Sequence, residues 1–188
     1  MSLEVTVSES QAGSNRPTSK KTTSRSLLLK QIVQCVCFAL LAFASFCIVT
    51  HFILQSVTVV GCSMAPTLKN ADHYLLNRWV YYLRAPKRHE IVVIRDPDTN
   101  GLSVKRVIAG TGDLVFFRNG SVYVNGRKIA EPYLPAGTQT FPGNHAQTQL
   151  FKCGKDDYVV LGDNRMNSAD SRQYGPIVRQ NVLGMIVQ

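Results

Sequence analysis

Three segments of this chain combine residue types that can hydrolyse an acyl bond. Ser63 lies in a bend between Gly61 and Pro66, Lys105 lies within an apolar run, and a polar loop follows at 162–175. A serine hydroxyl becomes a good nucleophile only when a base removes its proton. Histidine is the commonest base, but lysine can replace it where burial lowers the pKa of the amine. The pattern therefore predicts a serine hydrolase with a lysine base.

Lys105 has the surroundings that this role requires. Alternation along the expected strand 103–109 places it on one apolar face with Val107 and Ala109. Arg106 falls on the opposite face. A charged amine on an apolar face is penalised, and lysine can lose its proton there whereas arginine cannot. A lysine that reaches solvent at a sheet edge would give the same pattern, so this strand alone leaves both interpretations open.

The loop 162–175 is dense in Gly, Asp, Asn and Ser. This composition is typical of a solvated loop held by side-chain turns. The units Asp163/Arg165 and Asp170/Arg172 would equally well brace a rigid loop beside a site. Only the combination of this loop with the serine and the lysine favours catalysis.

An uncharged apolar segment at 31–54 precedes these motifs. At about 1.5 Å per residue it reaches roughly 36 Å, enough to cross a hydrocarbon core of about 30 Å. It is longer than the apolar core of a cleavable signal peptide, which has about 7–15 residues. Basic residues outnumber acidic ones in 1–30, which predicts a cytoplasmic N-terminus and places the chain after 55 across the membrane. The Ser/Thr-rich arm 1–30 is predicted to be disordered.

Short extended runs separated by turn residues fill the domain predicted at 55–188. Asn-Gly pairs at 119–120 and 125–126 predict two tight hairpins that join three antiparallel strands. The stretch 131–154 is predicted as a long loop and 78–83 as a short helical turn. The fold class is therefore mainly β. Strands are expected at 56–60, 73–77, 90–95, 103–109, 114–118, 121–124, 158–161 and 182–187.

The net charge and the residue types limit which classes of partner and cofactor are expected. The net charge of +9 is scattered and lacks a basic stripe interleaved with aromatic residues, so no nucleic-acid partner is expected. Attraction to anionic membrane lipid is the simpler account. Histidines and cysteines show no metal-ligand spacing, so neither a metal nor a cofactor is expected. Spacing does not decide whether Cys62 and Cys153 pair.

In this order, after one apolar span, the motifs closely resemble the type I signal peptidase family of bacteria. The resemblance runs from about Gln55 to Val187. Three ordered motifs are specific, whereas the serine motif alone would be weak. The matching segments are Ser63-Met64-x-Pro66-Thr67-Leu68, Lys105-Arg106-Val107-Ile108 with Gly112-Asp113, and Gly162-Asp163-Asn164-Arg165 through Ser168-x-Asp170-Ser171-Arg172.

The resemblance implies a serine endopeptidase with an antiparallel β catalytic domain, anchored in the bacterial plasma membrane. Its substrates would be the signal peptides of exported preproteins, cleaved after a small-x-small site. Ser63 would be the nucleophile and Lys105 the general base, with Ser168 orienting the amine.

The resemblance also assigns supporting roles. The backbone at Ser63 and Gly61 would form the oxyanion hole, and Met64 would lie beside the substrate. Some members place a serine where Gly61 stands, so here only backbone or water would assist. The expected supporting pairs are Arg106 with Asp163 and Asp170 with Arg172.

Two other functions stay open. One is a specialised processing peptidase of a secretion or conjugation system with the same dyad, and the other is a non-catalytic, membrane-anchored β binding module. The span argues against a cytosolic self-cleaving repressor. An organellar membrane also stays open, although Glu4 and Glu9 are not typical of a transit peptide.

Overall fold

The computed structural model describes residues 21–48, 54–143 and 149–187. The chain divides into two compact units, Met1–Phe46 and Cys47–Gln188, which are described separately.

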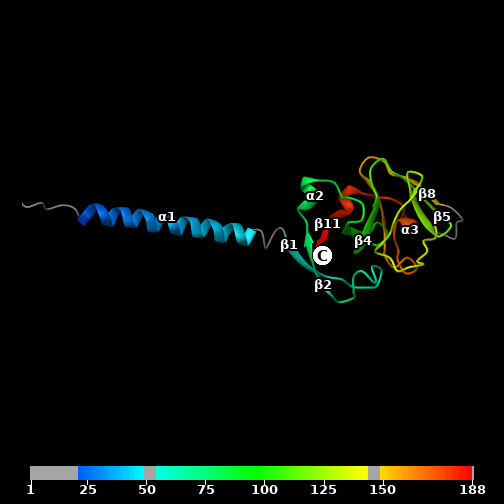
Figure 1. The fold of residues 1–188 in the computed structure, drawn as a ribbon, viewed down its shortest axis with the longest axis horizontal. Helices are drawn as coiled ribbons and strands as arrows, with labels where there is room; N and C mark the ends of the chain where they lie inside the picture. The colour runs from blue at the N-terminus through cyan, green and yellow to red at the C-terminus, as the bar shows by residue number, and fades with distance from the viewer. Residues whose placement is uncertain (1–20, 49–53, 144–148, 188) are drawn as a thin grey trace, which may run out of the picture. The chain divides into compact units, whose positions relative to one another are not determined.

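The described part of the first unit is an apolar helix, α1 (Lys21–Ile48), drawn as one unbroken helix in Figure 1. Its large apolar side chains are exposed all round, at 51–67%. The part Arg25–Ile48 is long and apolar enough to cross a membrane. The helix begins ten residues before the predicted start at Gln31, so the predicted disorder of the arm 1–30 is wrong for 21–30. Residues 1–20 lie outside the described residues.

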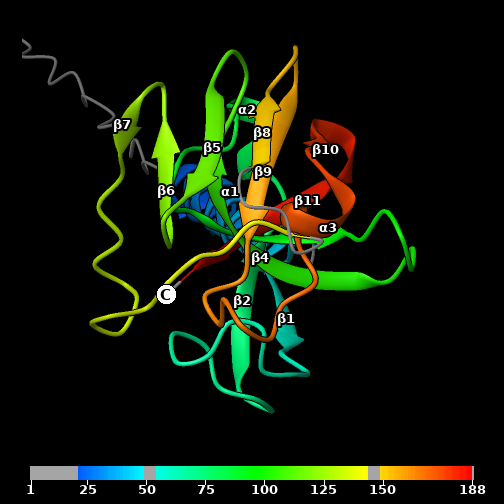
Figure 2. The same ribbon diagram turned by 90° about the vertical axis from the view of Figure 1, so that its right-hand side faces the viewer.

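The predicted end of the span is also wrong, because Leu54 belongs to the first strand of the second unit. That unit consists of two antiparallel sheets (Figures 1 and 2). The mainly β, antiparallel fold class is therefore confirmed. The larger sheet has the order β1 (Leu54–Thr58), β2 (His73–Asn77), β11 (Val182–Val187), β3 (Ile91–Arg95), β4 (Leu102–Ala109), β9 (Asp157–Leu161) and β10 (Ile177–Val178). The smaller has the order β7 (Arg127–Lys128), β6 (Ser121–Val124), β5 (Leu114–Arg118) and β8 (Gln149–Lys152).

The two predicted hairpins are confirmed. Asn119, Gly120, Asn125 and Gly126 all have positive φ, between 50° and 79°. Asparagine and glycine tolerate this left-handed region, which the tight turns at both ends of β6 require. The smaller sheet therefore forms from the β5–β6–β7 meander that the Asn-Gly pairs predict.

Three short elements were not predicted. Strand β8 lies inside the stretch expected to be a loop, where it pairs with β5. The helix α3 (Ser171–Tyr174) lies inside the polar loop 162–175, and strand β10 follows that loop. Each has two to four residues and is specified by its neighbours rather than by its own pattern. The predicted helical turn is present as α2 (Val80–Leu83), and a 3₁₀ turn, η2, covers Arg179–Asn181.

Strand β4 contains an irregularity that corrects one prediction. Its pairing with β9 shifts between Val107 and Ala109. Val107 packs in a cluster with Val92 and Val160, whereas Ala109 packs with Ile108 in a second cluster against the smaller sheet. The prediction that Val107 and Ala109 share a face is therefore wrong, because the shift breaks the alternation after Val107.

Cys62 and Cys153, which the sequence left open as a pair, are both free thiols. Cys62 is exposed in the loop after β1, and Cys153 is buried in the core. Burial raises the pKa of the Cys153 thiol to about 11. The structure therefore holds no disulfide between them.

Candidate active site

The loop 59–72 between β1 and β2 carries Ser63 and is called the nucleophile loop after the role predicted for that serine. It is fixed at several points. Gly61 has a φ of 104°, a conformation that favours glycine, and its N–H donates to the side chain of Asn70 at 2.8 Å. Met64 and Leu68 anchor the loop in a hydrophobic cluster with residues of β2 and β3. The half-buried Ser63 side chain is thus held on a packed loop.

Lys105 lies on β4 with only 3% of its surface exposed. Its neighbour Arg106 pairs with Leu161, the last residue of β9, so Lys105 lies one residue beyond the end of that ladder. The Nζ of Lys105 donates to Ser63 Oγ at 3.4 Å and to the Val104 carbonyl at 3.2 Å. The first distance is long for a hydrogen bond, as is common for catalytic pairs without bound substrate.

The environment of Lys105 favours the neutral amine. Burial lowers the pKa of Lys105, while the carboxylates of Asp170 and Asp96 act in the opposite direction. Desolvation is the larger effect, because removing an ammonium from water penalises the charged form. An amine with a lowered pKa can accept a proton from a neighbouring hydroxyl.

The third motif packs directly against the first. The backbone N–H of Asn164 donates to the Ser63 carbonyl at 2.9 Å, and the Asn164 side chain donates to the Cys62 carbonyl at 3.1 Å. A Cβ on Gly162 would lie 2.2 Å from Ser168 Oγ and 2.6 Å from the Ser63 carbonyl oxygen. Only glycine therefore lets the nucleophile loop and Ser168 approach each other.

Ser168 Oγ is buried and has no hydrogen-bond partner among the described residues. The bond expected between this hydroxyl and the Lys105 amine is thus not formed in this structure. The orienting role of Ser168 stays a prediction.

The expected pair of Arg106 and Asp163 is present and buried. Both carboxylate oxygens of Asp163 accept from the guanidinium, at 2.8 and 2.6 Å. Asp163 also accepts from Thr67 Oγ1 at 2.5 Å, which ties the pair to the nucleophile loop. The Arg106 guanidinium lies 3.9 Å from the centre of the Tyr133 ring and donates to the His89 carbonyl. This cluster joins β4, the nucleophile loop and the polar loop.

Asp170 and Arg172 also pair, through two side-chain hydrogen bonds of 2.8 Å. Asp170 additionally accepts from the Gly162 N–H at 3.0 Å, which closes the polar loop on itself. This carboxylate therefore fixes both ends of the loop that carries Ser168.

The interpretation of Asp163/Arg165 as a bracing unit is wrong. Arg165 instead forms an ion pair with Glu131 and donates to Thr140 Oγ1. Glu131 lies 34 residues earlier in the chain.

The two backbone N–H groups assigned to the oxyanion hole differ in whether they already donate a hydrogen bond. The N–H of Ser63 donates to no acceptor within the described part of the chain, whereas the N–H of Gly61 is already bonded to Asn70. Met64 is 1% exposed and packs in the hydrophobic cluster under the loop. The assignments of Gly61 and Met64 stay predictions.

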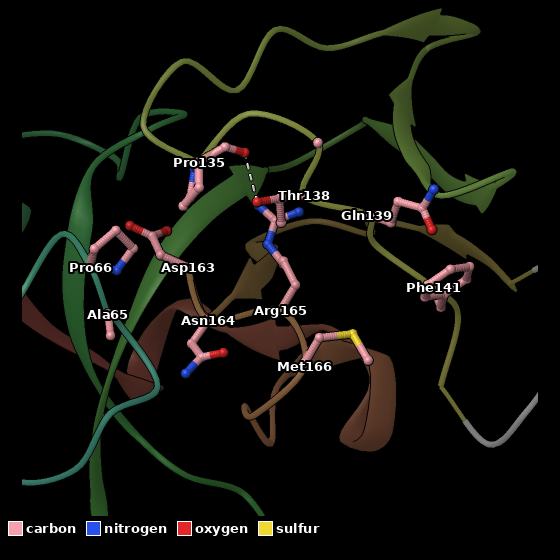
Figure 3. Close-up of a pocket in the computed structure, with 11 residues that line it drawn as sticks. Ala65, Pro66, Pro135, Thr138, Gln139, Phe141, Asp163, Asn164, Arg165 and Met166 are labelled. Carbon is pink, nitrogen blue, oxygen red and sulfur yellow. Dashed lines mark hydrogen bonds between the residues drawn. The ribbon is translucent and has the colours of Figure 1, made fainter.

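A pocket of about 640 Å³ lies beside the nucleophile loop (Figure 3). Ala65 and Pro66 line one side and Asn164 lies next to them, while Met166 and Phe141 lie toward the other end. Phe141 and Met166 are both exposed. The remaining lining residues are Pro135, Gly137, Thr138, Gln139, Asp163 and Arg165.

Comparisons with known proteins identify the family of the chain. The family model for signal peptidase, peptidase S26, matches residues 29–188. Signal peptidase I V of Bacillus subtilis (strain 168) is 35% identical over 136 residues, covering 68% of this chain and 80% of that protein. Signal peptidase I of Bacillus amyloliquefaciens is 34% identical over 182 residues, covering 90% of this chain and 89% of that protein.

A crystal structure of a signal peptidase I from Enterococcus faecalis V583 aligns with a TM-score of 0.48 and 28% identity, covering 55% of this chain and 98% of that chain. The family model and the relative from Bacillus amyloliquefaciens both span most of the present sequence. The chain therefore belongs to the signal peptidase family, peptidase S26, and is a serine endopeptidase.

Proposed function

We propose that Ser63 is the nucleophile and Lys105 the general base of a signal peptidase I that removes signal peptides from exported preproteins. The observation that supports this proposal is the distance of 3.4 Å between Lys105 Nζ and Ser63 Oγ, with the lysine only 3% exposed. A buried amine within reach of a hydroxyl is the arrangement that activates a serine without histidine.

The chemistry follows from these two groups. Neutral Lys105 takes the Ser63 proton while Oγ attacks the scissile carbonyl carbon, and an acyl-enzyme forms as the amine of the mature protein leaves. The protonated lysine supplies the proton to that amine. Neutral again, it deprotonates the water that hydrolyses the acyl-enzyme.

The negative charge on the tetrahedral intermediate needs donors that are already oriented. The N–H of Ser63 is proposed for this role, since it has no acceptor among the described residues. One such donor contributes about 2.7–4 kcal/mol of transition-state stabilisation. The N–H of Gly61 would join it only after leaving Asn70.

Helix α1 is proposed to anchor the enzyme in the bacterial plasma membrane, with the arm before it cytoplasmic and the β unit on the other side. The apolar length of Arg25–Ile48 and the basic residues before it support this topology. Anchoring enzyme and preprotein in one bilayer raises their effective concentration. Membrane lipid is then a second partner besides the signal peptide.

The direct test incubates the full chain in detergent with a labelled preprotein and sequences the new N-terminus. Cleavage after a small-x-small site is expected, and a bulky residue placed immediately before the cut is expected to abolish it. Cleavage confined to one dedicated preprotein would instead identify the specialised processing peptidase. Absence of cleavage from every preprotein would favour the non-catalytic binding module.

The pH profile tests the state of the base. Because burial lowers the pKa of Lys105, kcat/KM is expected to rise with pH through an ionisation well below the ordinary lysine value of about 10.4. The neutral amine predominates above that pKa and the inactive ammonium below it. A rising limb at 10.4 or above would contradict a desolvated base. The exposed Lys69 in the nucleophile loop is the matched control, since Lys69→Ala should leave the limb in place.

A further inference from the structure

Lys105 shares one face of the larger sheet with a defined set of side chains. It pairs with Val92 on β3, and Ser103 pairs with Ile94. Directly opposed residues of antiparallel strands point to the same side, as do residues two apart on one strand. Val107 belongs to this face as well, before the register shift of β4. The amine therefore extends over a surface that is otherwise mainly apolar.

The short helix α3 lies over this surface. Its first residue, Ser171, accepts through Oγ from the Val160 N–H of β9 at 2.9 Å, and Asp170 caps its start. Its last residue, Tyr174, packs against the hydrophobic cluster that includes Val92, Ile94, Val107 and Val160. The tyrosine thus packs on the same hydrophobic cluster as Val107 and Val92, which flank Lys105 along β4 and across on β3. Figure 2 shows α3 against the larger sheet.

The electrostatic surroundings of Tyr174 and Lys105 overlap. Asp170 and Asp96 act on the pKa of both residues, and Asp98 also acts on Tyr174. Burial and these carboxylates raise the pKa of Tyr174, so its hydroxyl stays protonated and does not compete as a base. The hydroxyl has no hydrogen-bond partner within the described residues, and the same is true of Ser103 Oγ.

We propose that Tyr174 is a positioning residue for Lys105, whose aromatic ring covers the lysine-bearing face of β3 and β4 and keeps water from the amine. The proposal rests on the assignment of Lys105 as general base. We assign the effect to the aromatic ring and not to the hydroxyl, because excluding water from this face requires buried apolar area and not a hydrogen bond. The members of that cluster on β3 and β4, Val92, Ile94 and Val107, are all apolar.

The test compares pH profiles of kcat/KM for Tyr174→Phe and Tyr174→Ala in the full-length enzyme. The phenylalanine variant keeps the ring. The rising limb of its pH profile of kcat/KM is therefore expected to coincide with that of the parent enzyme. Alanine admits water and favours the ammonium, so its limb is expected to move upward by about one pH unit. At a pH on the lower part of the limb this corresponds to a loss of about tenfold in kcat/KM, with recovery at high pH. Tyr174→Leu should give an intermediate shift and serves if the alanine variant does not fold.

Tyr158 provides the structural control, because it is buried in the same cluster but packs against Gly110, toward the other end of β4. Tyr158→Leu should lower stability without moving the limb. An unmoved limb in Tyr174→Ala and Tyr174→Leu, or a phenylalanine variant that behaves like alanine, would overturn the inference. If Lys105→Ala kept normal activity, both this inference and the proposed base would fail. If Lys105→Ala were inactive but the pH limb of the Tyr174 variants did not move, only the proposed role of Tyr174 would fail.

Discussion

Lys105→Ala is expected to lower the rate of preprotein cleavage by at least about a thousandfold, and Ser63→Ala by up to roughly a millionfold. Without the amine, no other side chain among the described residues bonds to the Ser63 hydroxyl, and without the hydroxyl no acyl-enzyme forms. Because the two groups act as one unit, the double variant should be hardly slower than the slower single variant. Single-turnover cleavage of a labelled preprotein provides the measurement.

Both variants should remain folded. Replacing Lys105 removes a buried amine whose charged form is penalised, and Ser63 contributes only a half-buried hydroxyl. Thermal unfolding and near-ultraviolet circular dichroism verify this point. Lys69→Ala, in the nucleophile loop but exposed, should cleave at the parent rate. Turnover within tenfold of the parent in either dyad variant would refute the assignment.

Arg106→Ala is expected to lower the free energy of unfolding of the β unit by about 3–5 kcal/mol. The Arg106 and Asp163 side chains are 7% and 0% exposed, so the substitution leaves a buried carboxylate without its counter-ion. It also removes the guanidinium from the Tyr133 ring. Urea unfolding of the full chain in mild detergent, followed by tryptophan fluorescence, measures the loss.

The Arg88–Asp113 ion pair supplies the matched control. Its side chains are 39% and 23% exposed and the contact is 3.2 Å, so Arg88→Ala should cost no more than about 1 kcal/mol. If the two variants lost similar free energies of unfolding, the buried pair would stabilise the fold no more than the exposed pair does. Arg106→Ala should also slow cleavage, since Asp163 would lose the partner that holds it beside Thr67.

The strand pattern could be predicted wherever local chemistry decides it. The Asn-Gly pairs determined two turns because few residues accept their backbone angles, and alternation placed Lys105 on an apolar face. The elements that were missed depend on partners. Strand β8 forms because it pairs with the edge of β5. Helix α3 forms because Asp170 caps its start and the Val160 N–H donates to Ser171 Oγ.

The site shows the same division. Ser63, Lys105 and the polar loop could be recognised from residue type and order. The partner of Arg165 could not, because Asp163 is nearer in sequence while Glu131 is the residue that the fold brings to it. The irregularity after Val107 was likewise invisible, since the run 103–109 reads as a regular strand. Long-range pairing, rather than residue type, decided these points.

The close packing at Gly162 has a consequence for biosynthesis. Ser63, Lys105 and the polar loop are far apart in the sequence, and the loop closes through Asp170 and Arg172, which are translated after both. A nascent chain on the ribosome therefore cannot complete this arrangement before Arg172 has been translated. Products that terminate before Arg172 are expected to lack peptidase activity.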